Sequence, residues 1–255
     1  MGRLLLSVVC VVLFLTALGA VTEEVKEERD RHGATNRLRH GAGEKTVYFI
    51  FTADSMFEGG DYALDVLKEK DVKASFFVTG NFLRDSVRNA PVLTRITGES
   101  HYLGSHGDRH ILLADWDASR SVLATPDSAV RDMDDCQELL KAYVPDIKKH
   151  KYVVPPFEWY NATHISAYRQ AGYIPLSICP GVLTYADYTT PDMEQYVSSD
   201  SIWSNFVDNL ENADLDGRFI LLHLGTDDTR TDKFYYRLGE MIDSLQSHGY
   251  RPAGL

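Results

Sequence analysis

The stretch TVYFIFTADSM, residues 46–56, is a run of β-branched and aromatic residues that ends on a small residue, an acid and a hydroxyl. Such a run predicts a strand over residues 46–51, because these side chains favour the buried, pleated surface of a sheet. Asp54 is then an isolated carboxylate just beyond the end of an apolar strand, between Ala53 and Ser55. The role of this carboxylate depends on which polar residues follow the other strands.

Apolar segments of strand and helix type alternate through the rest of the chain. Strands are expected at 74–79, 101–104, 152–154, 173–178 and 219–223, and helices at 61–70, 83–96, 125–143, 161–171, 199–213 and 232–247. The strands are apolar rather than alternating, which is typical of a parallel sheet covered on both faces. We therefore predict an α/β fold with a small or incomplete (β/α) barrel, or alternatively a doubly wound open sheet. In both folds the chemistry lies at the carboxyl ends of the strands.

The first 44 residues differ from the rest of the chain. In residues 1–20, Arg3 precedes an apolar run of sixteen residues with small residues at its end, the pattern of a cleaved signal peptide. An uncleaved membrane anchor would need about twenty apolar residues. Residues 21–44 are charged without apolar periodicity and are expected to be a linker or an N-terminal arm on the surface. One domain then spans residues 45–255, in a secreted or periplasmic protein.

Composition excludes several classes of partner. The formal net charge is −11, and removal of the segment with Arg3 makes it −12. Nucleic acids and anionic membranes select clustered Lys and Arg, so neither is expected as a partner after signal cleavage. Only Cys136 and Cys179 remain in the mature chain, too few for a disulfide scaffold, and we expect two buried thiols.

Four predicted strand ends carry ionisable or metal-binding side chains. Asp54 follows the first strand, His106 and His110 follow the third, Glu158 follows the fourth and His223 ends a late strand. A spacing of four places both imidazoles on one face of a helical turn, a spacing that zinc sites often use. His223 could instead be a core histidine bonded to a carbonyl. Glu158 could be an acid favoured by the dipole of the next helix.

Four motifs, taken in order, resemble the polysaccharide deacetylases of carbohydrate esterase family 4, the NodB homology domain. They are KASFFVTGNFLR (73–84), SHGDRH (105–110), VPPF (154–157) and LLHLG (221–225), and the resemblance runs from about residue 47 to residue 251. It implies a deformed (β/α)7 barrel with one divalent metal, usually zinc. It also implies metal-assisted hydrolysis of N-acetyl or O-acetyl groups on a sugar.

The resemblance also implies roles for individual residues. Asp54 stands at the position of the family's general base, and His106 and His110 stand at its metal-binding histidines. His223 stands at the general acid, and the backbone of Phe157 at the donor to the oxyanion.

Two positions depart from the family motif: Ser55 replaces a metal-binding Asp, and Val154 replaces the Arg that orients the base. Three interpretations follow. Ser55 or a water completes the metal site and Asp54 stays the base. Alternatively, Asp54 moves onto the metal, and Glu158 or Asp108 becomes the base. In the third, the site is inactive and the domain only binds glycan.

Aromatic residues near these motifs are candidates for stacking on sugar rings: Trp116, Trp159, Tyr160 and Tyr185. Asp187, in the loop after the fifth strand, is a candidate for orienting a histidine. The predicted function is a metal-dependent carbohydrate deacetylase. The alternatives are a non-catalytic glycan-binding domain and a metal hydrolase of the same fold acting on non-sugar amides.

Overall fold

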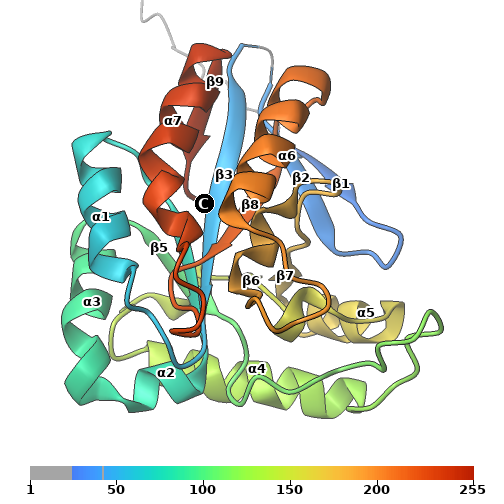
Figure 1. The fold of residues 1–255 in the computed structure, drawn as a ribbon. Coiled ribbons are helices and arrows are strands. Elements are labelled where there is room, and N and C mark those ends of the chain that lie inside the picture. The colour runs from blue at the N-terminus through green and yellow to red at the C-terminus, as the bar shows by residue number, and fades with distance from the viewer. Residues whose placement is uncertain (1–24, 42) are drawn as a thin grey trace, which may run out of the picture.

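A curled parallel sheet with helices around it forms the body of the protein in a computed structural model, which describes residues 25–41 and 43–255 (Figure 1). The strand order is β7-β6-β5-β4-β3-β8, and β9 also pairs with β3. The strands are β3 (Lys45–Ala53), β4 (Ser75–Val78), β5 (Tyr102–Ser105), β6 (Tyr152–Val153), β7 (Ile174–Pro175), β8 (Phe219–His223) and β9 (Tyr250–Ala253). The expectation of an α/β fold with parallel strands is confirmed.

The long strand β3 is the centre of the sheet and is apolar on both faces. Val47, Phe49 and Phe51 belong to one buried cluster, whereas Tyr48 and Ile50 belong to another on the opposite face. Each face must therefore be apolar, which explains the continuous run in the sequence. Its parallel pairing with β4 and β8 brings the carboxyl ends of the three strands together.

The two edges of the sheet are connected by loops and by an N-terminal hairpin. The Cys179 amide, shortly after β7, donates to the Phe219 carbonyl of β8 over 3.0 Å. The hairpin consists of β1 (Lys26–Arg29) and β2 (Thr35–Arg39), which pair antiparallel. The Thr35 carbonyl accepts from the Ser177 amide near β7, and the Leu38 amide donates to the Gly217 carbonyl before β8, each over 2.8 Å.

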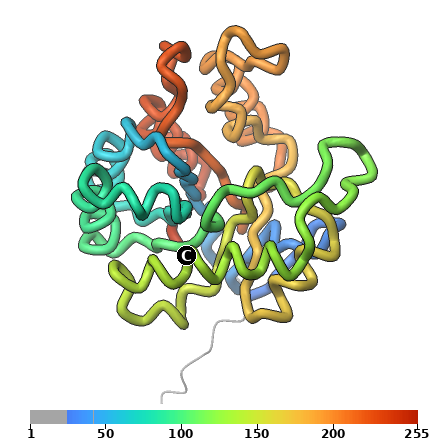
Figure 2. Tube along the Cα trace, turned by 90° about the horizontal axis from the view of Figure 1, so that it is seen from below, coloured from blue at the N-terminus to red at the C-terminus, as the bar shows by residue number. Residues whose placement is uncertain are grey.

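Of the two alternatives predicted for this part of the chain, a linker or an N-terminal arm on the surface, the hairpin is an arm that packs against the domain. Arg37 is buried and donates to the Asp214 carbonyl over 2.6 Å. Arg169 of the helix α5 (Ala162–Gln170) forms an ion pair with Glu27 over 2.6 Å. Figure 2 shows the blue hairpin beside the yellow segment that contains this helix. The predicted signal peptide and residues 21–24 lie outside the described residues.

The remaining helices cover the outside of the sheet. They are α1 (Gly60–Glu69), α2 (Gly80–Arg84), α3 (Ser86–Gly98), α4 (Pro126–Leu140), α6 (Ser199–Asn212) and α7 (Leu238–Ser247), with short 3-10 turns η1 (Ile147–Lys149), η2 (Pro156–Glu158), η3 (Leu183–Tyr188) and η4 (Phe234–Arg237). The single helix expected at 83–96 is two helices, because Asp85 leaves the helical conformation and its side chain caps α3.

Cys136 and Cys179 are free, buried thiols, as expected. Within residues 25–41 and 43–255, no helix is long and apolar enough to cross a membrane.

Candidate active site

Asp54 follows the last residue of β3, and its carboxylate is oriented by the end of the neighbouring strand. Asp54 Oδ1 accepts from Thr79 Oγ1 over 2.9 Å and from Asn81 Nδ2 over 3.0 Å. Both donors follow β4, which is in register with β3 up to the pair Ala53–Val78. Ser55, the next residue, is exposed. Two neutral donors therefore fix Asp54, where the family motif uses an Arg.

The two candidate metal-binding histidines meet through a bent loop and not, as predicted, on a helical turn. The residues after β5 are not helical, and His110 has a left-handed φ of 53°. Asp132 of α4 holds the loop, because its carboxylate accepts from the amides of Asp108 and Arg109 over 2.9 and 3.1 Å. The Nε2 atoms of His106 and His110 lie 3.1 Å apart.

The hydrogen bond at the other ring nitrogen fixes the tautomer of His106. Its Nδ1 lies 2.8 Å from the Val154 carbonyl, which can only accept, so Nδ1 carries the proton. Nε2 of the neutral ring then presents a lone pair toward His110. Burial lowers the pKa of both His106 and His110, and the charge of a neighbouring histidine acts in the same direction on each. The charge of Asp54 opposes this at His110, although its pKa is still lowered. Neutral imidazole is the form that binds metals.

Glu158 lies beside this pair rather than at a helix terminus. Helix α5 begins at Ala162 with Asn161 as its cap, so Glu158 is not one of the N-terminal residues of that helix, as the alternative interpretation required. Glu158 Oε1 lies 3.8 Å from His106 Nε2. It is buried and has no hydrogen-bond partner in the part of the chain that the structure describes. Burial raises the pKa of Glu158 to about 7, although the charge of His223 acts to lower it.

The turn that carries Glu158 is strained at two successive residues. Phe157 and Glu158 have φ values of 60° and 50°, a region that costs a residue other than glycine about 1–3 kcal/mol. The Phe157 side chain is 39% exposed. Its amide donates no hydrogen bond among the described residues, so it is available to an oxyanion.

Asp108, an alternative base in the sequence analysis, has another role. Its Oδ1 forms an ion pair with Arg84 over 2.6 Å, and its side chain is 3% exposed. Its carboxylate is therefore engaged by the Arg84 guanidinium in a charge-assisted hydrogen bond. The structure thus leaves Asp54 and Glu158 as the carboxylates near the histidine pair.

His223 ends β8 opposite Thr52 of β3 and forms a pair with Asp187, as the sequence suggested for this acid. Its Nδ1 donates to Asp187 Oδ1 over 2.7 Å, and its amide donates to Asp187 Oδ2 over 2.9 Å. Burial alone would lower the pKa of His223, but the charge and hydrogen bond of Asp187 raise it, with a further contribution from Glu158. This imidazole is therefore held in the protonated form over a wider pH range.

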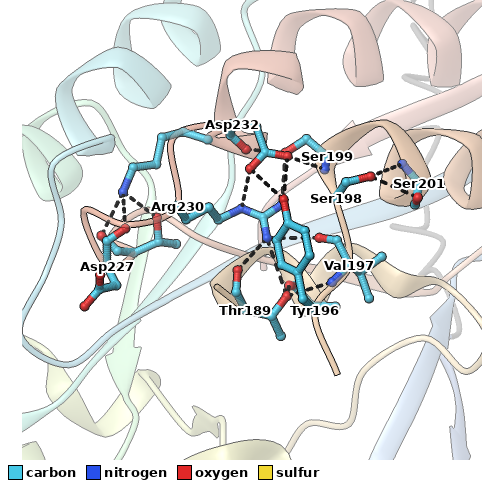
Figure 3. Close-up of polar contacts among 12 residues, drawn as sticks. Thr189, Tyr196, Val197, Ser198, Ser199, Ser201, Asp227, Arg230 and Asp232 are labelled. Atoms are coloured by element: carbon cyan, nitrogen blue, oxygen red, sulfur yellow. Dashed lines mark hydrogen bonds and ion pairs between the residues drawn. The ribbon is translucent and has the colours of Figure 1, made fainter. Parts of the chain in front are cut away.

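A buried arginine joins the two loops that hold the His223–Asp187 pair (Figure 3). Arg230, after β8, is fully buried and donates to the carbonyls of Thr189 and Val197 over 2.6 and 3.0 Å. It also donates to Ser199 Oγ over 3.0 Å and lies 3.6 Å from Asp232. Because Thr189 directly follows η3, these contacts fix the turn that contains Asp187.

A cavity of about 1130 Å³ contains most of these groups. Its lining includes His106, His110, Glu158 and His223, together with aromatic side chains and residues of the N-terminal hairpin. A cavity of this size holds more than one sugar ring.

Aromatic side chains predicted to stack on sugars differ in their exposure. Trp116 is 57% exposed and lies 5.3 Å from Trp159, ring to ring. Tyr185 also lines the cavity. Tyr160 is only 2% exposed, and its hydroxyl donates to Asp30 over 2.8 Å. Tyr160 therefore supports the cavity wall and offers no open stacking face, which corrects the prediction.

The histidine pair is the part of the site that fits a divalent metal. Two neutral imidazoles with facing Nε2 atoms match the donors that zinc selects. Across the described ranges, no three His, Cys, Asp or Glu side chains are grouped closely enough to hold a metal ion as they stand. Two carboxylates lie near the pair. The unsatisfied Glu158 Oε1 is 3.8 Å from His106 Nε2, and the charge of Asp54 acts on His110.

Sequence reasoning missed several residues that shape the site. Thr79 and Asn81 follow a predicted strand, so the rule of strand ends could have found them. Arg31 and His32 of the hairpin and Arg120 of the loop after β5 also line the cavity. No local pattern in their charged surroundings indicates this role.

Comparison with known proteins agrees with the motifs. The family model for polysaccharide deacetylase matches residues 39–176. Peptidoglycan-N-acetylmuramic acid deacetylase PdaA from Bacillus subtilis is 28% identical over 51% of this chain and 45% of its own length. A chitin deacetylase from Pestalotiopsis sp is 24% identical over 92% of this chain and 70% of its own.

Solved structures show the same fold. The structure of PdaA has a TM-score of 0.61 at 20% identity and covers 91% of this chain and 93% of its own. A family 4 pseudoenzyme from Bacillus anthracis has a TM-score of 0.61 at 17% identity, and the match covers 85% of this chain and 66% of the pseudoenzyme. The chain belongs to the polysaccharide deacetylase family and has the fold of family 4 carbohydrate esterases.

Proposed function

We propose that the protein is a metal-dependent hydrolase that removes acetyl groups from an N- or O-acetylated polysaccharide or oligosaccharide. The observation that carries this proposal is the meeting of the facing His106–His110 pair with the unsatisfied carboxylate oxygen of Glu158 in one cavity. We also propose a secreted or periplasmic location, on the strength of the apolar segment at residues 4–19.

The metal, which we propose to be zinc, would be held by His106, His110 and the carboxylate of Glu158. A divalent ion supplies Lewis acidity toward the acetyl group when it is bound. The Val154 carbonyl supports this assignment, because it keeps the Nε2 lone pair of His106 directed toward the site. Glu158 would then provide the negative charge that Ser55 does not.

Asp54 would act as the general base. Its fixed orientation by Thr79 and Asn81 supports this role, since a base must be held toward the water that it deprotonates. Asp54 also makes no polar contact within 4.0 Å of either histidine in the described chain, whereas Glu158 lies 3.8 Å from one. This assignment reverses the roles of the two acids in the interpretation that places Asp54 on the metal.

His223 would act as the general acid. Asp187 holds its Nδ1 proton, which leaves Nε2 to donate to the leaving amine or alkoxide. The free Phe157 amide would stabilise negative charge on the acetyl oxygen. Trp116 and Trp159 would stack on the sugar rings.

A catalytically impaired glycan-binding domain is the second candidate. It is favoured by the loss of the carboxylate at Ser55 and by the absence of a ready group of three ligands among the described residues. The two candidates predict different behaviour toward metal. A binding domain holds glycan without metal and releases no acetate.

Metal affinity of matched variants tests the proposal. Titration with Zn²⁺ should show Glu158→Gln binding at least about 10–100-fold more weakly than the wild type, because loss of even an outer-shell partner of a ligand costs that much. Asp54→Asn should retain the metal and lose acetate release. Adding Ser55→Asp to Glu158→Gln should restore affinity by returning a carboxylate to the motif position. Loss of metal in Asp54→Asn but not in Glu158→Gln would contradict the assignment, and a protein that binds no metal and releases no acetate would contradict the function.

A further inference from the structure

One wall of the cavity carries positive charge that takes no part in the proposed hydrolysis. It is formed by the β1–β2 hairpin and the loop after β5, and besides Arg29 its cationic members are Arg31 and Arg120, joined by His32. The whole chain has a formal net charge of −11. A local excess of cations in such an acidic protein indicates a specific anionic ligand rather than general attraction.

Neither guanidinium has an ion-pair partner among the described residues. Arg31 is exposed, and its Nε contacts His32 Nε2 over 3.0 Å. Arg120 Nη1 donates to the Tyr160 carbonyl over 2.7 Å, and the Arg120 guanidinium lies 3.4 Å from the centre of the Trp159 ring. The neighbouring Arg29, by contrast, is paired with Glu27 over 2.9 Å.

The nearby carboxylate of Asp30 does not satisfy these cations, because it holds the hairpin together. Its Oδ1 accepts from the amides of His32 and Ala34, and its Oδ2 accepts from the Tyr160 hydroxyl. The cations lie near enough to oppose one another. Burial lowers the pKa of Arg120, the charge of Arg31 lowers it further, and the charges of Tyr160 and Asp30 offset this only in part. An anion bound between them would relieve this repulsion.

Aromatic contacts connect the reaction centre to the cationic wall without interruption. Phe157 lies 4.1 Å from the His110 ring, Trp116 lies 5.7 Å from Phe157, and Trp159 lies 5.3 Å from Trp116. Arg120 covers Trp159 at the far end. A glycan that stacks along these rings with its acetyl group at the histidines brings a neighbouring sugar unit to the cations.

We propose that Arg31 and Arg120 bind the carboxylate of an acidic sugar unit next to the acetylated one. The substrate class is then an acetylated glycan with carboxylate-bearing sugars. This inference rests on the proposed function for the placement of the acetyl group, but the anion site itself is a property of binding. Charge-assisted hydrogen bonds from guanidinium to carboxylate provide the selectivity.

Calorimetric binding of two tetrasaccharides tests the proposal. One alternates N-acetylglucosamine with glucuronic acid, and the other is the neutral tetramer of N-acetylglucosamine. The acidic sugar should bind more tightly, and its Kd alone should rise with ionic strength. Arg31→Gln should weaken only the acidic sugar, by about threefold to tenfold. Arg88→Gln, on the exposed face of α3 and outside the cavity, removes the same charge and should change neither Kd.

Two outcomes overturn the acidic-sugar proposal: equal binding of both sugars, or an equal loss of both in Arg31→Gln. Failure of the deacetylase proposal has a different signature. If the acidic sugar binds selectively while neither sugar releases acetate, the anion site stands and the hydrolase does not.

Discussion

Replacement of Asp187 by Asn should move the activity of the protein to lower pH. In the folded chain Asp187 is fully buried, and its two oxygens accept from Nδ1 and from the amide of His223. Asn is nearly the same size and its carbonyl oxygen still accepts a hydrogen bond, but it carries no charge. The substitution therefore isolates the electrostatic part of the interaction.

The expected magnitude follows from the balance of effects on His223. Burial lowers the pKa of this imidazole, and Asp187 provides the largest opposing effect. An opposite charge at this range shifts a pKa by about one to three units, and each unit corresponds to about 1.4 kcal/mol. The pKa of His223 should fall by that amount in Asp187→Asn. Because a general acid must be protonated, the apparent pKa of the alkaline limb of the kcat–pH profile should fall by the same amount. At pH values above this limb, kcat should be about tenfold lower for each pH unit of the shift.

The assay combines kcat for acetate release across pH with the titration of His223 followed by NMR. Asp208→Asn is the matched control, because Asp208 is exposed on α6 and loses the same charge. The reasoning is refuted if the pKa of His223 is unchanged or higher in Asp187→Asn. It is also refuted if Asp208→Asn shifts the pH profile as far.

Two other substitutions test how the site is held. Arg230→Met leaves the Thr189 and Val197 carbonyls without their donor and should lower the free energy of unfolding in urea by about 3–5 kcal/mol. Arg237→Met removes two surface ion pairs, with Asp200 and Glu240, and should cost only about 1 kcal/mol. Asn81→Ala removes one of the two donors to the Asp54 carboxylate. It should lower kcat about threefold to tenfold and leave the Zn²⁺ affinity unchanged. A loss of Zn²⁺ affinity would instead place Asp54 on the metal.

Much of the site could be predicted because parallel strands end at one edge of a sheet. Asp54 follows a strong apolar run and His223 ends another, whereas His106 follows a short strand. The register of β3 with β8 brings the ends at Asp54 and His223 together. Polar residues at the ends of predicted strands are therefore neighbours in the folded chain. Glu158 was predicted on the same ground, although its unsatisfied oxygen appears only in the folded chain.

The hairpin could not be predicted because its stabilising partners are distant in sequence. Arg37 and Arg39 both contact Asp214, and Glu27 pairs with Arg169. Local periodicity contains no information about such ion pairs, and charged strands resemble linkers in composition. The helical turn predicted for His106 and His110 was wrong for a related reason, since Asp132 imposes the shape of that loop from α4.

The two departures from the family motif, at Ser55 and Val154, are coupled to the position of Glu158 in this fold, which favours a working site over an inactive one. The motif places two acids after the first strand, whereas here Asp54 remains there and Glu158 approaches the histidines from the turn after β6. An Arg at Val154, a fully buried position four residues before Glu158, would be a competing partner for that acid, because a guanidinium binds a carboxylate strongly. With Val154 apolar, Glu158 Oε1 stays unpaired, and Thr79 and Asn81 orient Asp54 without a cation. We therefore interpret Ser55, Val154 and Glu158 as a single rearrangement that preserves the number of carboxylates around the histidine pair.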